Sequence, residues 1–527
     1  MAETLQVARL PIGFNGFNGS NNLSQMDIGE LADATNISYE QNLIQKEAGA
    51  AKFNATTLES GADIISGIYW EPTASAAYDV VYVNGKLLRD TNTDGTFITT
   101  LKTGLSTSAT TGQFVEAGNE SATDNRKLFF MNGVNNVEYV DGTGVTTTAL
   151  TTAAADWSGS NWPITGAVHE DRLWLAGNAN DPHRVYYSSV TNHAEFVTGA
   201  GTISVFPGEG GRIRNVTSFK GYLIVFKEKA IFYINTTDPT EANWKVGRIS
   251  RNVGVFNPLA VDIVDDDVFF IDQTGLLRAL STMTEYGSYA TRNLFDHHDM
   301  NHWVQSNISY ADLPVARLLY YPTRRELHAA LPIGGSTSNN IRVVLDLTEG
   351  RLRYRLIDRD DVYSMWLRNE SSVPGMAFGD GSGFVYELDQ ENRTKDGAYT
   401  SRLETAPTDF SDQDPSFGTR NKHAHYLELE FEAASAGTMD VDVIWDSTVY
   451  QTVTFNLEPA GAALGSFVLG TDALGASGTL KNYRKRIVGQ GRRISFAFKH
   501  NGDNQNFKLA SAFFGFKLAD HRLQHGE

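Results

Sequence analysis

The sequence predicts an all-β protein in which a β-propeller is followed by a β-sandwich domain. Two properties of the chain carry this prediction. Its 527 residues include 48 glycines, together with many Thr, Asn, Ser and Asp residues, and these residue types form the turns that an all-β fold needs. Short apolar runs joined by turn sequences also recur about every 45 residues, close to the length of a four-stranded propeller blade.

The clearest of these repeats is a β-hairpin in the first half of the chain. Two apolar and aromatic runs, Ala167–Gly177 and Arg184–Ser188, flank Asn178–His183, which consists almost wholly of turn formers. This arrangement is typical of two antiparallel strands and their connection. A further apolar run precedes each hairpin, and we expect it to form the inner strand of the blade, with the hairpin in the middle.

Six more segments share the hairpin pattern. In Asp79–Arg89 the turn is Asn84–Gly85, and an Asn-Gly pair between apolar runs is the strongest short hairpin signal. The other copies are Lys127–Val140, Gly221–Ile234, Asp267–Leu280, Arg317–Leu331 and Gly375–Leu388. We therefore predict a propeller of six blades, with seven as the alternative, over residues 61–400. A sandwich pair or a β-helix would also repeat strands, although the coils of a β-helix are shorter and more regular.

Residues 1–60 read as an N-terminal arm. The arm begins with a glycine-rich stretch that does not suit a helix interior. We predict a short helix over Asp27–Asn36, where good helix formers precede an asparagine, and a strand at Ile37–Tyr39. The simplest expectation is an ordered surface arm that completes a sheet.

Residues 401–420 read as a linker, because Thr405–Ser416 is polar, acidic and contains proline. After it the predicted strands become longer and alternate strictly between apolar and polar residues, as antiparallel sandwich strands do. These strands are His425–Glu432, Met439–Trp445, Val449–Phe455, Arg493–Lys499 and Phe507–Phe516. The sequence thus predicts a separate β-sandwich over residues 421–527.

Composition and charge exclude some classes of function. With 44 basic and 62 acidic residues, the chain has a net charge of −18, which disfavours free binding to a nucleic-acid duplex. An acidic wall would suit a channel through which nucleic acid must slide. The chain has no cysteine, so disulfides and thiolate chemistry are excluded. No signal peptide and no apolar run of roughly 20 residues are visible, and we expect a soluble protein.

The segment Asp296–His302 holds three imidazoles and two carboxylates in sequence. Imidazole and carboxylate groups can hold a transition metal. The spacing matches no established metal motif, however, and the alternative is a polar loop between blades.

Acidic pairs give a second set of candidates. Glycoside hydrolysis needs two carboxyl groups on either side of the scissile bond, and Asp265–Asp267 and Asp360–Asp361 could supply them. Acidic residues are also ordinary turn formers. Asp380–Gly383 and Asn92–Gly95 resemble fragments of calcium loops but lack the closing acid, and we interpret them as turns. We therefore predict no catalytic, cofactor-binding or metal-binding residue, no cofactor, and a protein that is not an enzyme.

One dense basic cluster stands out in this acidic chain. It could contact a phosphate-bearing surface or an acidic neighbouring subunit. It could equally be a solvated sheet edge, where Lys and Arg prevent strand pairing. Its members are Lys481, Arg484, Lys485, Arg486, Arg492 and Arg493.

Four segments together resemble proteins of tailed bacteriophages. They are Gly16–Asn18, Gly29–Asn36, Lys46–Phe53 and the hairpin Asp171–Ser188. The family that they resemble is the tail nozzle, or tail tubular protein, of podoviruses, which carries a β-propeller and closes the distal end of a short tail. The chain departs from the usual pattern at Phe17, where an aliphatic residue is common.

The resemblance implies a structural virion protein in the phage tail, made in the host cytoplasm. Nozzle proteins assemble as a closed ring, usually of six copies, below the portal and the tail adaptor protein. Tail fibre or spike proteins and the host cell surface are further expected partners, and the DNA genome leaves through the channel without specific binding. We expect the arm and the sandwich to contact neighbouring subunits, because a ring needs heterologous contacts that close.

Two alternatives from other classes remain open. One is a propeller glycosidase that acts on host surface polysaccharide through Asp265, Asp267 or Asp361. The other is a receptor-binding module that uses the sandwich and its basic cluster.

Overall fold

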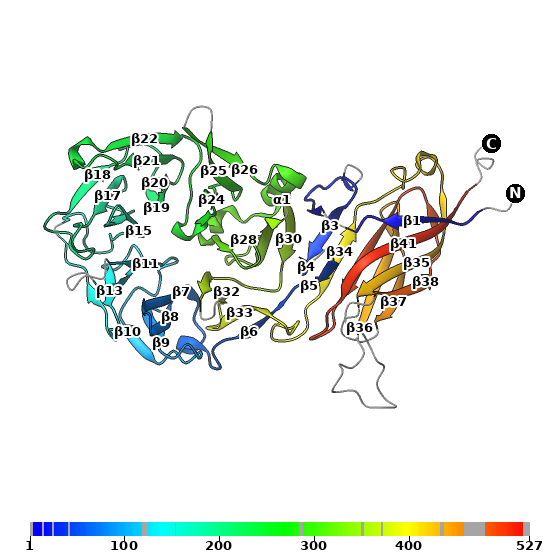
Figure 1. Cartoon of the computed structure of the whole chain (residues 1–527), viewed down its shortest axis with the longest axis horizontal. Helices are drawn as coiled ribbons and strands as arrows, with labels where there is room; N and C mark the ends of the chain where they lie inside the picture. Colours follow the sequence, from blue (N-terminus) through cyan, green and yellow to red (C-terminus); the bar gives the residue numbers. More distant parts are fainter. Residues whose placement is uncertain are drawn as a thin grey trace.

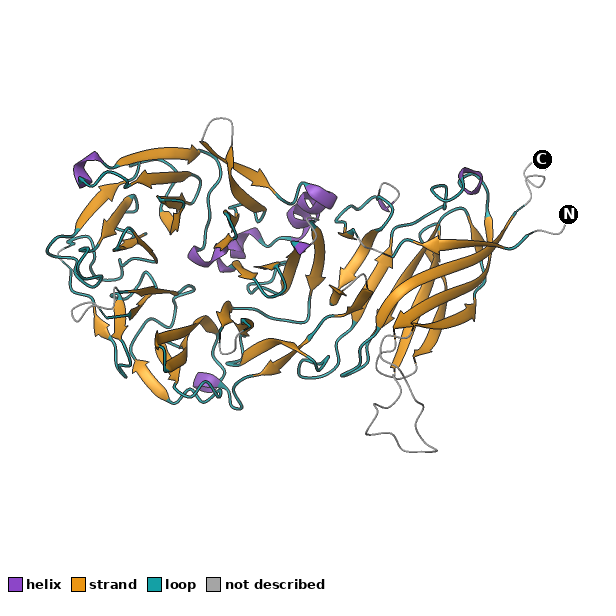
Figure 2. Cartoon of the chain, viewed as in Figure 1, coloured by secondary structure: helices purple, strands orange, loops and turns teal. Residues whose placement is uncertain are grey.

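The computed structural model describes residues 4–12, 15–23, 26–40, 43–118, 125–152, 154–283, 288–348, 352–369, 373–432, 437–457 and 480–519, and all structural statements concern these residues. They form a ring-shaped propeller and an elongated sandwich beside it (Figure 1). Nearly all regular structure is strand (Figure 2). The α-helix is α1 (Met300–Asn307), and the 3-10 turns are Leu58–Ser60, Glu241–Asn243, Pro258–Ala260, His297–Asp299, Tyr310–Val315 and Pro415–Phe417. Within the described ranges, no helix is long and apolar enough to cross a membrane.

Six blades are separate four-stranded sheets. The first three contain β7 (Ile64–Thr73), β8 (Ala76–Val83), β9 (Lys86–Asp90) and β10 (Thr99–Lys102); β11 (Gln113–Ala117), β12 (Lys127–Met131), β13 (Glu138–Asp141) and β14 (Thr148–Ala149); and β15 (Thr165–His169), β16 (Arg172–Ala176), β17 (Arg184–Tyr187) and β18 (Gly201–Ser204).

The next two blades contain β19 (Ile213–Phe219), β20 (Tyr222–Lys227), β21 (Ile231–Asn235) and β22 (Lys245–Ser250); and β23 (Val261–Val264), β24 (Asp267–Ile271), β25 (Leu277–Met283) and β26 (Ser288–Asn293). The last separate blade contains β31 (Ser364–Arg368), β32 (Gly375–Gly379), β33 (Val385–Gln390) and, as its outer strand, β6 (Gly49–Lys52) from the N-terminal region. A strand from the start of the chain therefore completes the blade formed near residue 390.

A seventh four-stranded unit occupies the remaining place in the ring. It contains β27 (Arg317–Tyr321), β28 (Glu326–Leu331), β29 (Ile341–Asp346) and β30 (Arg353–Ile357). Its inner strand β27 contacts the inner strands β23 and β31 of the blades on either side. Its outer strand β30 continues by hydrogen bonding into the sandwich, so that this blade belongs to a ten-stranded sheet. The all-β propeller is confirmed, with one blade fused to the second domain.

The predicted hairpins owe their shape to local turn chemistry. Asn84 and Gly85 have φ values of 45° and 70°, the left-handed pair that a two-residue type I′ turn requires. Val83 consequently pairs with Lys86. Most predicted hairpins are the second and third strands of a blade, whereas Arg317–Leu331 forms the first and second strands.

The sandwich packs two sheets face to face. One sheet has the order β38-β35-β41-β5-β4, with β1 and β39 at its margins, and the other is the β3-β34-β40-β36-β37 half of the ten-stranded sheet, with β2 beside β3. Aromatic side chains fill the space between them: the ring of Phe514 lies 5.8 Å from that of Phe496 and 6.0 Å from that of Trp445.

The sandwich strands come from both ends of the chain. They are β1 (Gln6–Leu10), β2 (Gly16–Phe17), β3 (Glu30–Thr35), β4 (Ile37–Glu40), β5 (Leu43–Lys46), β34 (Ser401–Thr405), β35 (Lys422–Glu432), β36 (Gly437–Trp445), β37 (Thr448–Leu457), β38 (Leu480–Arg486), β39 (Gln490–Gly491), β40 (Ile494–His500) and β41 (Lys508–Leu518). The propeller is thus inserted between β5 and β34. The segment predicted as a linker contains β34, and its Phe410 is buried.

The helix predicted over Asp27–Asn36 is wrong. Residues Glu30–Thr35 form strand β3, which pairs with β34 on one side and meets β2 and β30 on the other. Pairing with strands from distant parts of the chain outweighs the helix propensity of Glu, Leu and Ala, which is worth only a few tenths of a kcal/mol per residue. The strand predicted at Ile37–Tyr39 is confirmed as β4.

Candidate functional site at the propeller–sandwich junction

A buried ionic cluster joins the propeller to the sandwich. Glu47, in the crossing from β5 to β6, accepts hydrogen bonds from Arg355 Nε of β30 and from Arg324 Nη1, both at 3.0 Å. Arg355 Nη2 also donates to Glu326 Oε2 of β28 at 2.9 Å, and Arg324 Nη1 donates to Asp389 Oδ1 of β33 at 2.6 Å. The cluster therefore ties one crossing of the chain to two neighbouring blades.

The two glutamates of this cluster remain charged although they are buried. Burial alone would raise the pKa of Glu47, but the guanidinium groups of Arg355 and Arg324 outweigh it and lower the pKa to about 2. The same two groups hold the pKa of Glu326 well below its usual range against the effect of burial. Buried ion pairs add little net stability over apolar packing, but removal of one partner is strongly destabilising. Loss of either Glu47 or Arg355 would therefore destabilise the place where the chain crosses from the sandwich to the propeller.

Asn36 forms a second tie at the same junction. Its φ of 54° lies in the left-handed region, which Asn tolerates better than most residues. Its side-chain Nδ2 donates to Asp358 Oδ1 at 2.6 Å and to the Thr400 carbonyl at 2.8 Å, and its backbone N donates to the Leu356 carbonyl at 2.8 Å. Asn36 thus holds the sandwich, β30 and the chain that returns from the propeller at one point.

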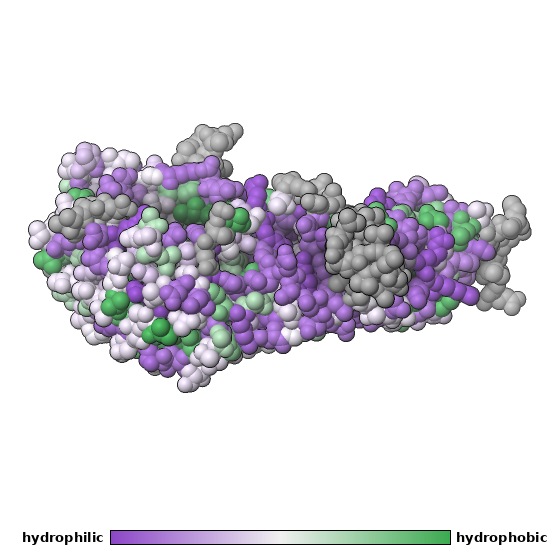
Figure 3. Space-filling model, turned by 60° about the horizontal axis from the view of Figure 1, so that its bottom comes forward, coloured by the Kyte–Doolittle hydropathy of each residue, from purple (hydrophilic) through white to green (hydrophobic). Residues whose placement is uncertain are grey.

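Glu30 of β3 forms the third tie. Its Oε2 accepts from Asn18 Nδ2 at 2.6 Å, and its Oε1 lies 2.6 Å from His298 Nδ1. Burial acts to raise the pKa of Glu30, but hydrogen bonds from His298, the Asp27 backbone and Asn18 leave it lowered. On the face shown in Figure 3, the surface between the two domains is mostly hydrophilic.

A cleft of about 560 Å³ opens beside the ionic cluster. Tyr39, Glu40 and Gln45 of the sandwich line one side, and Arg324, Asp346 and Arg353 of the fused blade line the other. Its lining mixes charges of both signs, so it could hydrogen-bond to a polar side chain of a partner.

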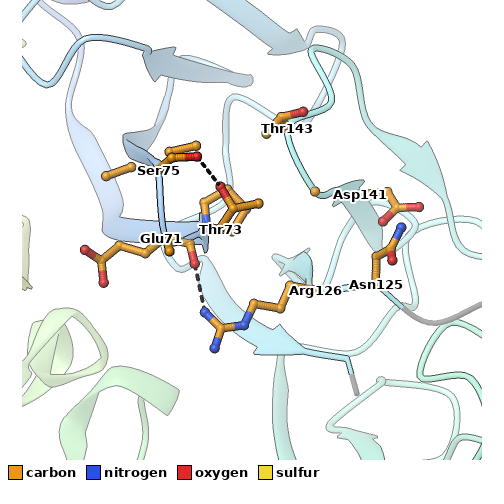
Figure 4. Close-up of a pocket in the computed structure, with 12 residues that line it drawn as sticks. Glu71, Thr73, Ser75, Asn125, Arg126, Asp141 and Thr143 are labelled. Carbon is orange, nitrogen blue, oxygen red and sulfur yellow. Dashed lines mark hydrogen bonds between the residues drawn. The ribbon is translucent and has the colours of Figure 1, made fainter. Parts of the chain in front are cut away.

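A larger, open cleft of about 1040 Å³ lies between the first two blades. Thr73 of the β7–β8 hairpin lies across the cleft from Asp141 of the next blade, whereas the Glu71 carboxylate points away from both Asp141 and Arg126 (Figure 4). Arg126 Nη1 donates to the Glu71 carbonyl at 2.9 Å. The cleft offers hydroxyl, carboxylate and guanidinium groups for hydrogen bonding, and none of the residues singled out in the sequence lines it.

The histidine cluster does not converge. His298 contacts Glu30, whereas His302 Nε2 lies 2.8 Å from Asn21 Nδ2. In the described part of the chain, no three His, Asp or Glu side chains are placed to share a metal ion. The segment instead packs the N-terminal strands against the propeller.

The acidic candidates are separated by the fold. Asp265 lies in the turn after the inner strand β23 and pairs with Arg325 at 3.6 Å. Asp267 Oδ2 accepts from Ser281 Oγ at 2.7 Å. Asp361 precedes the inner strand β31 and accepts from Ser338 Oγ at 2.7 Å. Because inner strands run in the same direction around a propeller, Asp265 and Asp361 lie on opposite faces.

Asp361 has two acidic neighbours that the sequence pattern did not indicate. Burial and the charges of Asp361 and Asp380 raise the pKa of Asp63, which precedes β7. Burial also raises the pKa of Asp380 in the β32–β33 turn, and Asp361 adds to this effect. Asp63 and Asp361 lie about 300 residues apart in sequence, which is why no local motif contains both.

The turn interpretation of the calcium-like fragments is confirmed. Asp380 Oδ1 accepts from the backbone N of Ser382 at 2.9 Å and of Phe384 at 2.8 Å. Asp94 Oδ1 accepts from Thr96 N at 3.0 Å. These are the local bonds of aspartate-capped turns.

Four residues of the basic cluster lie on β38, the outermost strand of one sandwich sheet, and Arg492 and Arg493 lie between β39 and β40. β38 pairs with β35, and no other described strand pairs with it. Arg484 Nε donates to Glu428 Oε2 on β35 at 2.8 Å. Lys485 and Arg486 are exposed.

The sequence contains one signal for the ionic junction. Arg353 and Arg355 alternate with Tyr354 and Leu356 in an otherwise apolar strand. Arginine is rarely buried without a partner, so two arginines in such a strand indicate buried carboxylates elsewhere in the chain. Their positions cannot be inferred from the local sequence.

Comparisons with known proteins do not assign a family. No family model and no curated protein matches the chain. Among solved structures, the chain is similar to the extracellular domain of a hybrid two-component system from B. thetaiotaomicron, with 14% sequence identity and a TM-score of 0.40. That match covers 74% of this chain and 45% of the other.

Proposed function

We propose that this protein is a structural subunit of a bacteriophage tail, of the nozzle type, which assembles into a closed ring and surrounds the channel through which DNA leaves. The observation that carries the proposal is the position of the phage-like segments. Glu30, Asn36 and Glu47, which lie in those segments, all act at the propeller–sandwich junction. Their role is architectural, as a scaffold subunit requires.

The junction supports this role because it makes one body of two domains. A ring subunit must hold its contact surfaces at fixed angles, since heterologous contacts close only when the rotation between neighbours is constant. The shared ten-stranded sheet, the Asn36 tie and the Glu47–Arg355 pair restrain the same junction from different sides.

The distribution of charge agrees with a DNA channel. Residues 421–527 contain eleven basic and eleven acidic side chains, so the whole net charge of −18 belongs to residues 1–420. An acidic surface repels the phosphate backbone and lets DNA pass without binding.

The test is the mass of the purified chain by light scattering, alone and with the adaptor protein of its phage tail. We expect a ring, formed either by the chain itself or on the adaptor. A chain that stays monomeric in both samples contradicts the proposal.

One observation favours a second candidate, a glycosidase. Asp361, Asp63 and Asp380 lie close enough for their charges to interact, and the pKa values of Asp63 and Asp380 are raised. Glycoside hydrolysis uses a carboxylic acid with a raised pKa as general acid beside a second carboxyl group. Release of reducing sugar from host polysaccharide, lost in Asp361→Asn and kept in Asp265→Asn, would support this candidate. Equal activity of the two variants, or none in the wild type, would exclude it.

A further inference from the structure

We propose that the sandwich binds a second copy of this chain, and that its contact surface is the basic edge: Lys481, Arg484, Lys485, Arg486, Arg492 and Arg493, together with Val449, Tyr450 and Val488. Its occupant is the acidic propeller face of the neighbouring copy. This inference rests on the proposed ring assembly and assigns one of its contact surfaces.

The basic edge includes three exposed apolar side chains. Tyr450 is 61% exposed, Val449 55% and Val488 42%. They lie together: Val488 N donates to Gln451 Oε1 at 2.9 Å, and a Cβ on Gly489 would lie 3.0 Å from Tyr450 Cδ1. An exposed aromatic residue among aliphatic side chains with a charged rim is typical of protein–protein contact sites.

The charged residues of the basic edge favour a partner of opposite charge. Lys485, Arg486 and Arg492 are exposed, and they gather six of the eleven basic residues of residues 421–527 into one surface together with Lys481, Arg484 and Arg493. Like charges at an edge strand oppose pairing of that edge with its own copy. The basic edge therefore disfavours a two-fold dimer through β38 and favours a head-to-tail contact, which is the kind that builds rings.

The propeller supplies the complementary surface. Residues 61–400 contain 40 acidic and 28 basic side chains. Several exposed acids lie in the turns between the first and second strands of blades, namely Glu170, Asp171, Asp265 and Asp266, with Lys220 and Arg325 as basic residues in equivalent turns. These turns share one face of the propeller, because the inner strands run in the same direction. Opposite charges on the two surfaces steer association and fix its register.

The test is charge reversal in the full-length chain under conditions in which the wild type forms rings. Lys485→Glu/Arg486→Glu should lower the fraction of chain in rings about tenfold or more. The matched control is Lys245→Glu/Arg251→Glu, which makes the same charge change at exposed positions on and next to β22 and should leave the rings intact. Unchanged circular dichroism would show that both variants fold.

Compensating substitutions that restore the rings would identify which acidic residues the basic edge contacts. Glu170→Lys/Asp171→Lys or Asp265→Lys/Asp266→Lys, added to Lys485→Glu/Arg486→Glu, should restore rings if that pair of acids faces the basic edge. Rings that survive in Lys485→Glu/Arg486→Glu overturn the inference and leave the proposed function intact. Loss of rings that neither acidic pair restores also overturns it. A wild type that forms no ring contradicts the proposed function itself.

Discussion

The guanidinium of Arg355 in β30 donates to the carboxylate of Glu47 at 3.0 Å, across 308 residues of sequence. Both side chains are buried, and each belongs to a different part of the fold: Arg355 to a propeller blade and Glu47 to the crossing from the sandwich. The position of the propeller relative to the sandwich therefore depends on this ion pair as well as on packing.

Replacement of Arg355 by Met should lower the free energy of unfolding by about 3–5 kcal/mol, because it leaves Glu47 and Glu326 buried with one cation fewer. Urea-induced unfolding followed by circular dichroism measures this loss.

The control for that substitution is Arg402→Met. Arg402 pairs with Asp358 at 2.7 Å and with Asp33 at 3.2 Å, but its side chain is 39% exposed. Solvent screening limits such a pair to about 1 kcal/mol or less. Equal losses of unfolding free energy in the two variants would show that burial of Arg355 does not increase its contribution to stability.

Gly49→Ala should disrupt the blade that the N-terminal strand β6 completes. A Cβ at Gly49 would lie 1.7 Å from the Asn392 carbonyl oxygen and 2.8 Å from that of Thr394, so the backbone would have to move. Gly375→Ala in β32 of the same sheet is the control, because its nearest neighbour lies 3.7 Å away. We expect a clearly lower melting temperature for Gly49→Ala only. Similar melting temperatures in the two variants would contradict the role of β6 in completing the propeller blade.

His500 should make the protein less stable as the pH falls below 6.5. Burial, with a smaller effect from Lys46, lowers the pKa of His500 to about 4, and neither ring nitrogen has a hydrogen-bond partner among the described residues. Between pH 6.5 and 4 the unfolded chain binds a proton that the folded chain does not. Stability therefore falls as the pH drops through this window, by up to about 3 kcal/mol.

Unfolding of His500→Phe and wild type at pH 7 and pH 4.5 measures this contribution. The variant should lose less stability between the two pH values than the wild type. His297→Phe, at an exposed position, should behave like the wild type. The same pH dependence in all three chains would rule out His500 as the cause.

Local signals predicted the blades, and distant pairings escaped prediction. The Asn84–Gly85 turn forms its hairpin from neighbouring residues alone. The local sequence of β3 favours a helix, and the partner that makes it a strand, β34, lies about 370 residues further along the chain. The junction also depends on distant pairings, since Glu47 and Arg355 become neighbours only when the propeller has closed.

Electron microscopy of the assembled protein would show whether this chain forms rings. We expect closed rings of six copies, in which each subunit shows a propeller and a sandwich in the same relative orientation around an open channel. Particles that remain single propeller–sandwich units, with or without the adaptor protein, would contradict the claim that this chain is a ring-forming tail subunit.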